Sequence, residues 1–227
     1  MRTVRLLLTL LLLMMFKLAM AGDLTNYSAA VTYVRCLAKT YDLQEAAKLE
    51  LSRVKDPTSV LMTNVRMSTK AKLEMRAMIA EMNQLDVGED AKPFVQNLSD
   101  FYRKKIDLND SLIEVASKLL DGPKPGADYG KLLASTAEIS GILEQIDEQI
   151  FKLANAFFAI MIDLRPDKSG HANHLKITRA QKAELLALIE SRFGASIKGK
   201  NQNWTVGGAW LLRSNLQKGF KASDDPW

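Results

Sequence analysis

The stretch LLASTAEISGILEQIDEQIFKLANAFFAIMIDL, residues 132–164, decides the fold class. Its apolar side chains recur at alternating steps of three and four residues, which places them on one face of an α-helix. The positions of this seam are Leu132, Thr136, Ile139, Leu143, Ile146, Ile150, Leu153, Phe157, Ile160 and Leu164. At 1.5 Å per residue, a helix from about residue 129 to residue 164 is roughly 50 Å long. Such a helix must bury its seam against other helices.

Three upstream segments have the same period, and strand-like alternation is missing throughout. They cover about 24–54, 58–85 and 93–120. Asp56-Pro57, DVGEDAKP and DGPKPG separate the four segments, and these are sequences that end or begin helices. Because short connections join long neighbouring helices, the helices must run antiparallel. We therefore predict an all-α protein whose residues 22–165 form a long up-down-up-down four-helix bundle.

Residues 166–227 have a different character and are expected to form an extension that docks on one end of the bundle. Two short helices are predicted, over 180–193, ended by Gly194, and over about 205–218. The extension also carries all three tryptophans of the chain, Trp204, Trp210 and Trp227. Tryptophan anchors contacts both inside proteins and at interfaces.

The end of the fourth helix, LANAFFAIMIDL at 153–164, is apolar almost all round. Bundle neighbours cover roughly one side of a helix, so the outer side needs a tail, a second subunit, another protein or a lipophilic ligand. We predict that residues 178–220 fold back over it, with Trp210 as the main anchor. The apolar residues expected beneath the tail are Phe157, Phe158, Ile160, Met161 and Ile162. The residues expected to mediate interactions are Phe158, Ile162, Trp204, Trp210 and Trp227.

The N-terminus has the pattern of a secretory signal peptide. Arg2 and Arg5 precede an apolar run over 6–16, and Ala19-Met20-Ala21 is a small-x-small cleavage sequence. We predict cleavage after residue 21 and a periplasmic or secreted protein with no transmembrane segment after cleavage. Lys17 lies between the apolar run and the cleavage sequence, which leaves an uncleaved anchor as the alternative.

Charge and cysteine content narrow the function further. The chain has 31 basic and 26 acidic residues, and the leader removes three of the basic ones, so the mature charge is close to neutral. Charges are mixed along every segment, whereas a nucleic-acid-binding protein needs a basic stripe, so nucleic acid is excluded as a partner. Cys36 is the single cysteine, and we expect it to pack as a small buried hydrophobe, with an intermolecular disulfide as the alternative.

Two groups of residues are weak candidates for metal ligands. His171 and His174 are spaced H-x-x-H in a glycine-containing loop, and two ligands are too few for zinc. Met75, Met78 and Met82 share one helical face and could bind Cu(I), but the same face carries the apolar seam, which favours core packing. The Glu-x-x-His pairs of di-iron bundles and a haem-binding Cys-x-x-Cys-His are both absent from the sequence. We predict no cofactor and no metal.

Catalytic patterns are weak. Glu144, Asp147 and Glu148 form a carboxylate cluster in LEQIDEQI, and Asp147 lies beside the seam. Acid–base catalysis needs one carboxyl group to be buried with a raised pKa, and a solvated helix face explains the cluster better. Lys105 falls on the seam of the third helix, and we expect its ammonium to extend outward to water. Enzymatic activity is left open but disfavoured.

The sequence therefore favours an exported, non-enzymatic helical bundle that acts through protein–protein interaction. The partner is another envelope or secreted protein, or a second copy in a homo-oligomer. Adaptor, inhibitor and immunity-type roles fit equally. The alternative is a periplasmic carrier of a soft metal such as Cu(I), or of a small lipophilic ligand held in the bundle.

Overall fold

The computed structural model describes residues 2–87, 91–122, 129–162, 179–199 and 203–218, with the side chains of 2–26, 129, 158–162, 179 and 218 excepted. Six helices and no strand occur in these ranges. The helices are α1 (Arg2–Ser52), α2 (Pro57–Asn83), α3 (Lys92–Leu120), α4 (Tyr129–Ile162), α5 (Arg179–Lys198) and α6 (Trp204–Lys218). The predicted all-α class is confirmed.

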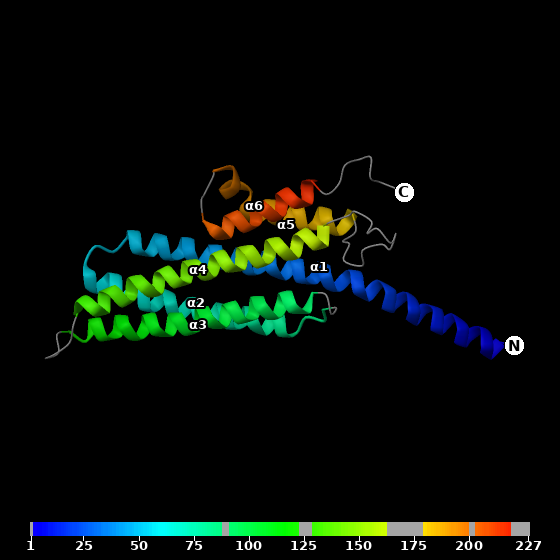
Figure 1. Cartoon of the computed structure of the whole chain (residues 1–227), viewed down its shortest axis with the longest axis horizontal. Helices are drawn as coiled ribbons and strands as arrows, with labels where there is room; N and C mark the ends of the chain where they lie inside the picture. The colour runs from blue at the N-terminus through cyan, green and yellow to red at the C-terminus, as the bar shows by residue number, and fades with distance from the viewer. Residues whose placement is uncertain (1, 88–90, 123–128, 163–178, 200–202, 219–227) are drawn as a thin grey trace.

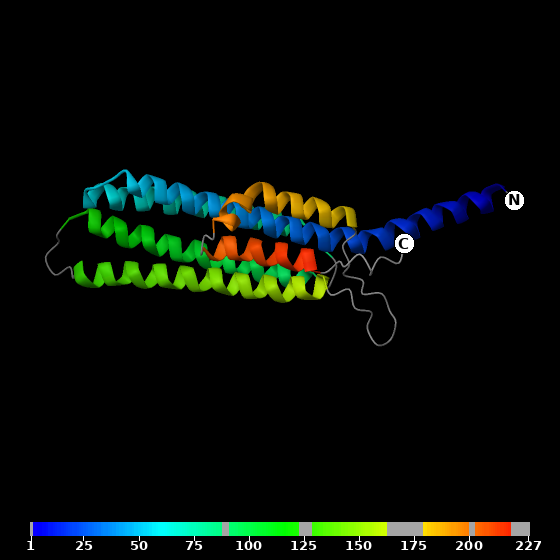
Figure 2. The ribbon, with the colours of Figure 1, turned by 90° about the horizontal axis from the view of Figure 1, so that it is seen from above.

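The four long helices alternate in direction, and the two short helices pack over one end of them (Figures 1 and 2). The up-down-up-down bundle with a C-terminal helical pair is therefore confirmed. The start of α2 is fixed by local contacts. The Asp56 carboxylate accepts a hydrogen bond from the Ser59 backbone N–H at 2.8 Å, and Pro57 is the first residue of the helix. This cap pairs a backbone N–H that has no partner within the helix. Proline is well tolerated in the first turn, because the N–H that it lacks would also have no partner there.

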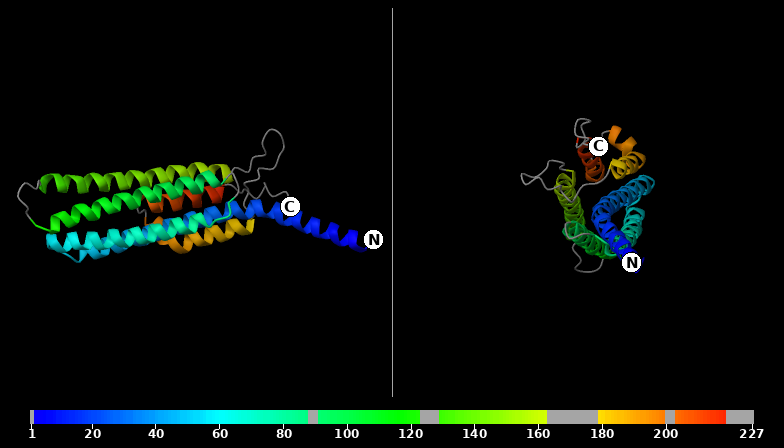
Figure 3. Two further views of the ribbon diagram at one scale, coloured as in Figure 1. Left: turned by 90° about the horizontal axis from the view of Figure 1, so that it is seen from below. Right: turned by 90° about the vertical axis from the view of Figure 1, so that its right-hand side faces the viewer.

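The bundle is not closed by α1 and α4, whose backbones hardly approach one another. Instead α6 lies between them and packs against both, and α5 packs against α1 and α6. The end-on view in Figure 3 shows this ring, with α6 beside α4 and α5 on the outside. Because α6 is much shorter than α1 and α4, it fills this opening along only part of the bundle.

The core lies in the part of the bundle that α5 and α6 cover. Phe94 and Phe157 stack with ring centroids 4.1 Å apart, and Tyr33 meets the edge of Phe94 at 5.9 Å. Toward the α1–α2 turn and the start of α4, the seam residues are only half-buried. These residues are Leu51, Leu61, Leu112, Leu119, Leu132 and Leu143. The two ends of one bundle are therefore packed to different densities.

Polar contacts attach the short helices to α1. The Tyr27 hydroxyl donates to a Glu184 carboxylate oxygen at 2.6 Å, and the hydroxyls of Tyr41 and Ser196 lie 2.7 Å apart. Where α6 crosses α1, a Cβ on Gly208 would lie 2.8 Å from the Tyr33 Oη and 3.4 Å from Leu37 Cδ1. The close approach of these two helices therefore depends on glycine at this position.

The C-terminal helices fold back on the bundle as expected, but two details of the prediction are wrong. Trp210 is 52% exposed and does not anchor α6. The buried stripe of α6 consists of Val206, Ala209, Leu212 and Leu216. Since Gly208 must face α1, Trp210 is turned to the outer side of the helix. Gly194 does not end α5, which continues to Lys198.

The side chains of Phe158, Ile160, Met161 and Ile162, and all of Trp227, lie outside the described residues. Phe157 is described and is 8% exposed. Its ring stacks on Phe94 of α3, so its burial belongs to the bundle core. Cover of the apolar end by the C-terminal helices therefore stays a prediction.

Candidate functional site

A cavity of about 280 Å³ lies among the four long helices. It lies toward the loosely packed part of the bundle. The apolar residues of its lining are Leu43, Ala47, Met67, Ala71, Met75, Leu112 and Leu143. The polar residues of its lining are Thr40, Gln44, Asn64, Ser68, Lys105, Asn109 and Asp147. Since all four helices contribute, the cavity exists only in the folded bundle.

An ion pair between α3 and α4 forms part of this wall. The Lys105 Nζ donates to Asp147 Oδ1 at 2.6 Å, and the two side chains are 9% and 16% exposed. The sequence-based expectation that Lys105 extends outward is therefore wrong. The Asp147 carboxylate gives the ammonium a partner inside the bundle, and a buried ammonium without one would be far more costly.

Three further polar side chains of the wall are engaged within the protein. The Asn109 amide donates to the Lys105 carbonyl at 2.7 Å, and the hydroxyls of Thr40 and Tyr102 lie 3.3 Å apart. Burial raises the pKa of Tyr102 well above its usual value, so this phenol stays neutral. Gln44 Oε1 accepts from the Asn203 amide at 2.7 Å, which places the start of α6 beside the cavity.

Asn64 and Ser68 differ from these groups. They lie one turn apart on α2 and are half-buried in the cavity wall. Within the described part of the chain, neither side chain makes a hydrogen bond. An amide and a hydroxyl in this position can both donate and accept hydrogen bonds. They are therefore the two polar side chains of the lining that make no hydrogen bond among the described residues, and both can bind a molecule in the cavity.

The three carboxylates of α4, those of Glu144, Asp147 and Glu148, lie in different surroundings. Glu144 is exposed, and Glu148 accepts from Lys152 at 2.7 Å on the helix surface. Asp147 alone reaches the cavity, where Lys105 occupies one of its oxygens. The three carboxylates therefore do not form a shared acid–base site.

Of the two groups of candidate metal ligands, the structure describes only the methionines. Met75, Met78 and Met82 are 4%, 0% and 2% exposed and belong to the hydrophobic core, as the packing interpretation requires. His171 and His174 lie outside the described residues. Where the structure describes the side chains, no three or more histidine, cysteine or carboxylate groups are arranged so that they could hold a metal ion.

Cys36 is buried, at 1% exposure, as expected for a small core residue. Burial raises the pKa of its thiol to about 12, and the Glu81 carboxylate adds to this effect. The nucleophilic thiolate is therefore scarce at neutral pH. These properties do not suit an intermolecular disulfide.

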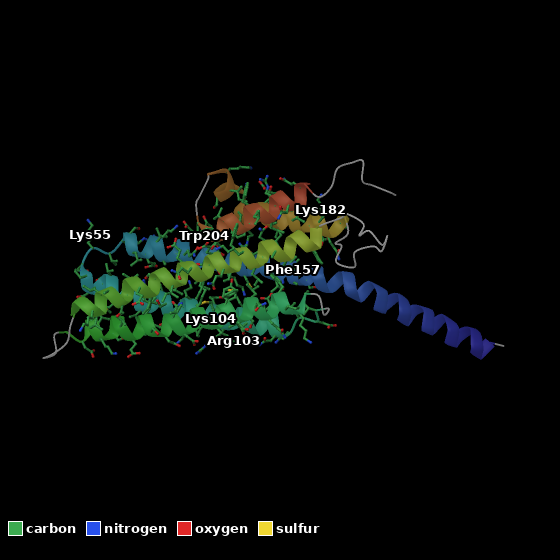
Figure 4. All side chains as sticks on the ribbon, in the orientation of Figure 1. Lys55, Arg103, Lys104, Phe157, Lys182 and Trp204 are labelled. Carbon is green, nitrogen blue, oxygen red and sulfur yellow. The ribbon has the colours of Figure 1, made fainter. Side chains whose placement is uncertain are left out.

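A larger cavity, of about 490 Å³, lies between the end of α2 and the start of α3. Residues of two helices line it, among them Lys92, Asp100 and Arg103. The Arg103 guanidinium donates to the Asp100 carboxylate at 2.5 Å on an exposed surface. Figure 4 shows Arg103 and Lys104 on the outer side of α3. Because this hollow is bordered by solvated charges, the four-helix cavity is the better candidate.

Two exposed tryptophans make α6 the second feature of interest. Trp204 is 37% exposed and Trp210 is 52% exposed. The Trp204 ring packs against Phe151 with centroids 5.6 Å apart, at the start of α6 (Figure 4). The sequence predicts both residues to mediate interactions, because tryptophan anchors contacts inside proteins and at interfaces.

Comparisons of the chain with protein-family models, with curated proteins and with solved structures gave no match. Among the described helices, none contains a stretch both long and apolar enough to span a bilayer.

Proposed function

We propose that this protein acts by binding, and that the four-helix cavity holds a small lipophilic molecule. The observation that carries the proposal is the cavity itself, a space of about 280 Å³ walled by seven apolar and seven polar residues of one bundle. Ligand sites are concave, mainly apolar and furnished with a few placed polar groups, and the space between bundle helices is a common location.

The incomplete closure of the bundle supports the same proposal. Since α6 lies between α1 and α4 along only part of their length, none of the described helices covers the seam in the remaining part. Leu143 and Leu112 line the cavity and are only half-buried. A bound apolar molecule would remove such surface from water, at about 25 cal/mol per Å².

The first expected outcome concerns a neutral fluorescent lipophile, N-phenylnaphthylamine. We expect the mature protein to bind it, and Leu143→Trp to weaken the binding at least tenfold, because the larger side chain fills the cavity. Fluorescence titration measures the affinity. The matched control is Leu133→Trp, since Leu133 is on the same helix, is 60% exposed and does not line the cavity. Equal loss in both variants, or in neither, would contradict the proposal.

We also propose that the protein is exported and that residues 1–21 are a cleaved signal peptide. The described core residues of α1 begin at Ala29, and the first turns of α1 extend beyond the other helices (Figure 1). Cleavage would therefore leave the described core intact. We expect N-terminal sequencing of protein from its own host to begin at Gly22. A membrane-bound protein that retains Met1 would support the uncleaved anchor instead.

A second candidate function is protein–protein interaction through α6, for which the exposure of Trp204 and Trp210 is the specific observation. The partner is another envelope or secreted protein, or a second copy of the chain. We expect self-association in sedimentation experiments at micromolar concentration, and its loss in Trp210→Ser. Leu73→Ser is the control, because Leu73 is 59% exposed on α2. A wild-type protein that stays monomeric would restrict this candidate to other partners.

A further inference from the structure

The charges in the cavity wall neutralise each other. The Lys105 ammonium and the Asp147 carboxylate lie 2.6 Å apart, and the Lys105 side chain is 91% removed from solvent. Among the described residues that line the cavity, these are the only charged side chains. A charged ligand would have to break this pair or bury a third charge beside it, and both are costly in a protein interior.

The two side chains of the lining that make no hydrogen bond within the described residues are neutral. Asn64 and Ser68 face the same cavity from one side of α2 and make no hydrogen bond within the described residues. Apolar side chains from all four long helices line the same cavity, among them Met67 of α2 and Leu143 of α4. The lining therefore combines apolar surface with two neutral groups, one turn apart on α2, that can both donate and accept.

We infer that the ligand is an uncharged amphipathic molecule, with an aliphatic or aromatic body and a hydroxyl or amide head that binds Asn64 and Ser68. This inference rests on the proposed function and specifies the ligand class of the same site. It also assigns separate roles within the wall: the ion pair holds α3 to α4 without binding the ligand, and α2 supplies the contacts to the ligand head.

The inference is tested by displacement of N-phenylnaphthylamine with octanol, octanoate and octylamine, which share one chain and differ in head charge at neutral pH. We expect octanol to displace the dye at a concentration at least tenfold lower than either ion. Octanol also leaves water more readily than the ions do, so this preference alone does not locate the head.

The second arm of the experiment removes the polar head contact. Asn64→Leu keeps the approximate size of the side chain and deletes its amide. We expect octanol to bind about fivefold to tenfold more weakly to this variant, the effect of one lost hydrogen bond, while the dye itself still binds. Asn97→Leu is the control, because Asn97 is exposed on α3 and lies outside the cavity.

The outcomes separate the inference from the function on which it rests. Octanoate or octylamine displacing the dye as well as octanol would overturn the inference and leave the binding function standing. An octanol affinity unchanged by Asn64→Leu would overturn it in the same way. A dye that does not bind, or that binds regardless of Leu143→Trp, would overturn both.

Discussion

Replacing Lys105 by Met is expected to destabilise the folded protein by about 3 kcal/mol or more, because it leaves the Asp147 carboxylate buried without its partner. The Asp147 side chain is 16% exposed, so water replaces the lost ammonium only in part. Urea denaturation followed by far-ultraviolet circular dichroism measures the change in the free energy of unfolding.

Two further variants make this result specific. The double variant Lys105→Met, Asp147→Leu removes both charges and is expected to recover most of the loss, since buried ion pairs are often replaced by apolar residues at little cost. Lys118→Met breaks a pair with Glu114 whose side chains are 56% and 66% exposed, and should leave the free energy of unfolding almost unchanged, because water solvates both charges. If the double variant is as unstable as the single one, the loss lies in packing and not in the unpaired charge.

The second large effect is expected in α6. Leu212 is 1% exposed, and Leu212→Ala should cost about 2–5 kcal/mol, because it removes buried methyl groups and leaves a cavity. Trp210→Ala removes a larger side chain that is 52% exposed, and we expect a loss of less than about 1 kcal/mol. Urea denaturation of the two variants under identical conditions measures the difference.

The order of these two effects is informative because residue size alone predicts the opposite. If Trp210→Ala proves the more destabilising, then Trp210 anchors α6 after all, and the arrangement of α6 described above is wrong. If Trp210→Ala is stable but loses self-association, the exposed tryptophan serves an interface. Urea denaturation and sedimentation of Trp210→Ala therefore distinguish a loss of folding stability from a loss of self-association.

The candidate site also explains why one bundle has two kinds of interior. Where α6 covers the opening between α1 and α4, large side chains such as Phe94 and Tyr33 are fully packed. Beside the start of α6, the lining of the cavity contains Asn64, Ser68 and Lys105, whose polar groups an apolar core would exclude. A polar wall with available hydrogen-bonding groups is better suited to a ligand than to structural packing.

The helices themselves could be predicted from the order of residues. The three-to-four spacing of Leu143, Ile146 and Ile150 is a local property, and so are the breaks at Asp56-Pro57 and DGPKPG, because helix formation depends on neighbours a few residues apart. The antiparallel order followed from short connections. The burial of the three seam methionines followed from their positions in that pattern, and the burial of Cys36 followed from the usual behaviour of a free cysteine.

The partners of individual side chains depended on contacts between distant segments. Lys105 and Asp147 both stood out in the sequence, but 42 residues separate them, and no local pattern indicates that they meet. The cavity could not be predicted either. Asn64 and Ser68 lie on the same face of the second helix as the three methionines, and this position indicates packing against another helix. Trp210 was assigned to the wrong face, because the side of α6 that is buried is set by the close approach of Gly208 to Tyr33. Periodicity fixes which residues share a helical face, whereas the energy of packing against distant helices decides which face is buried and where space remains.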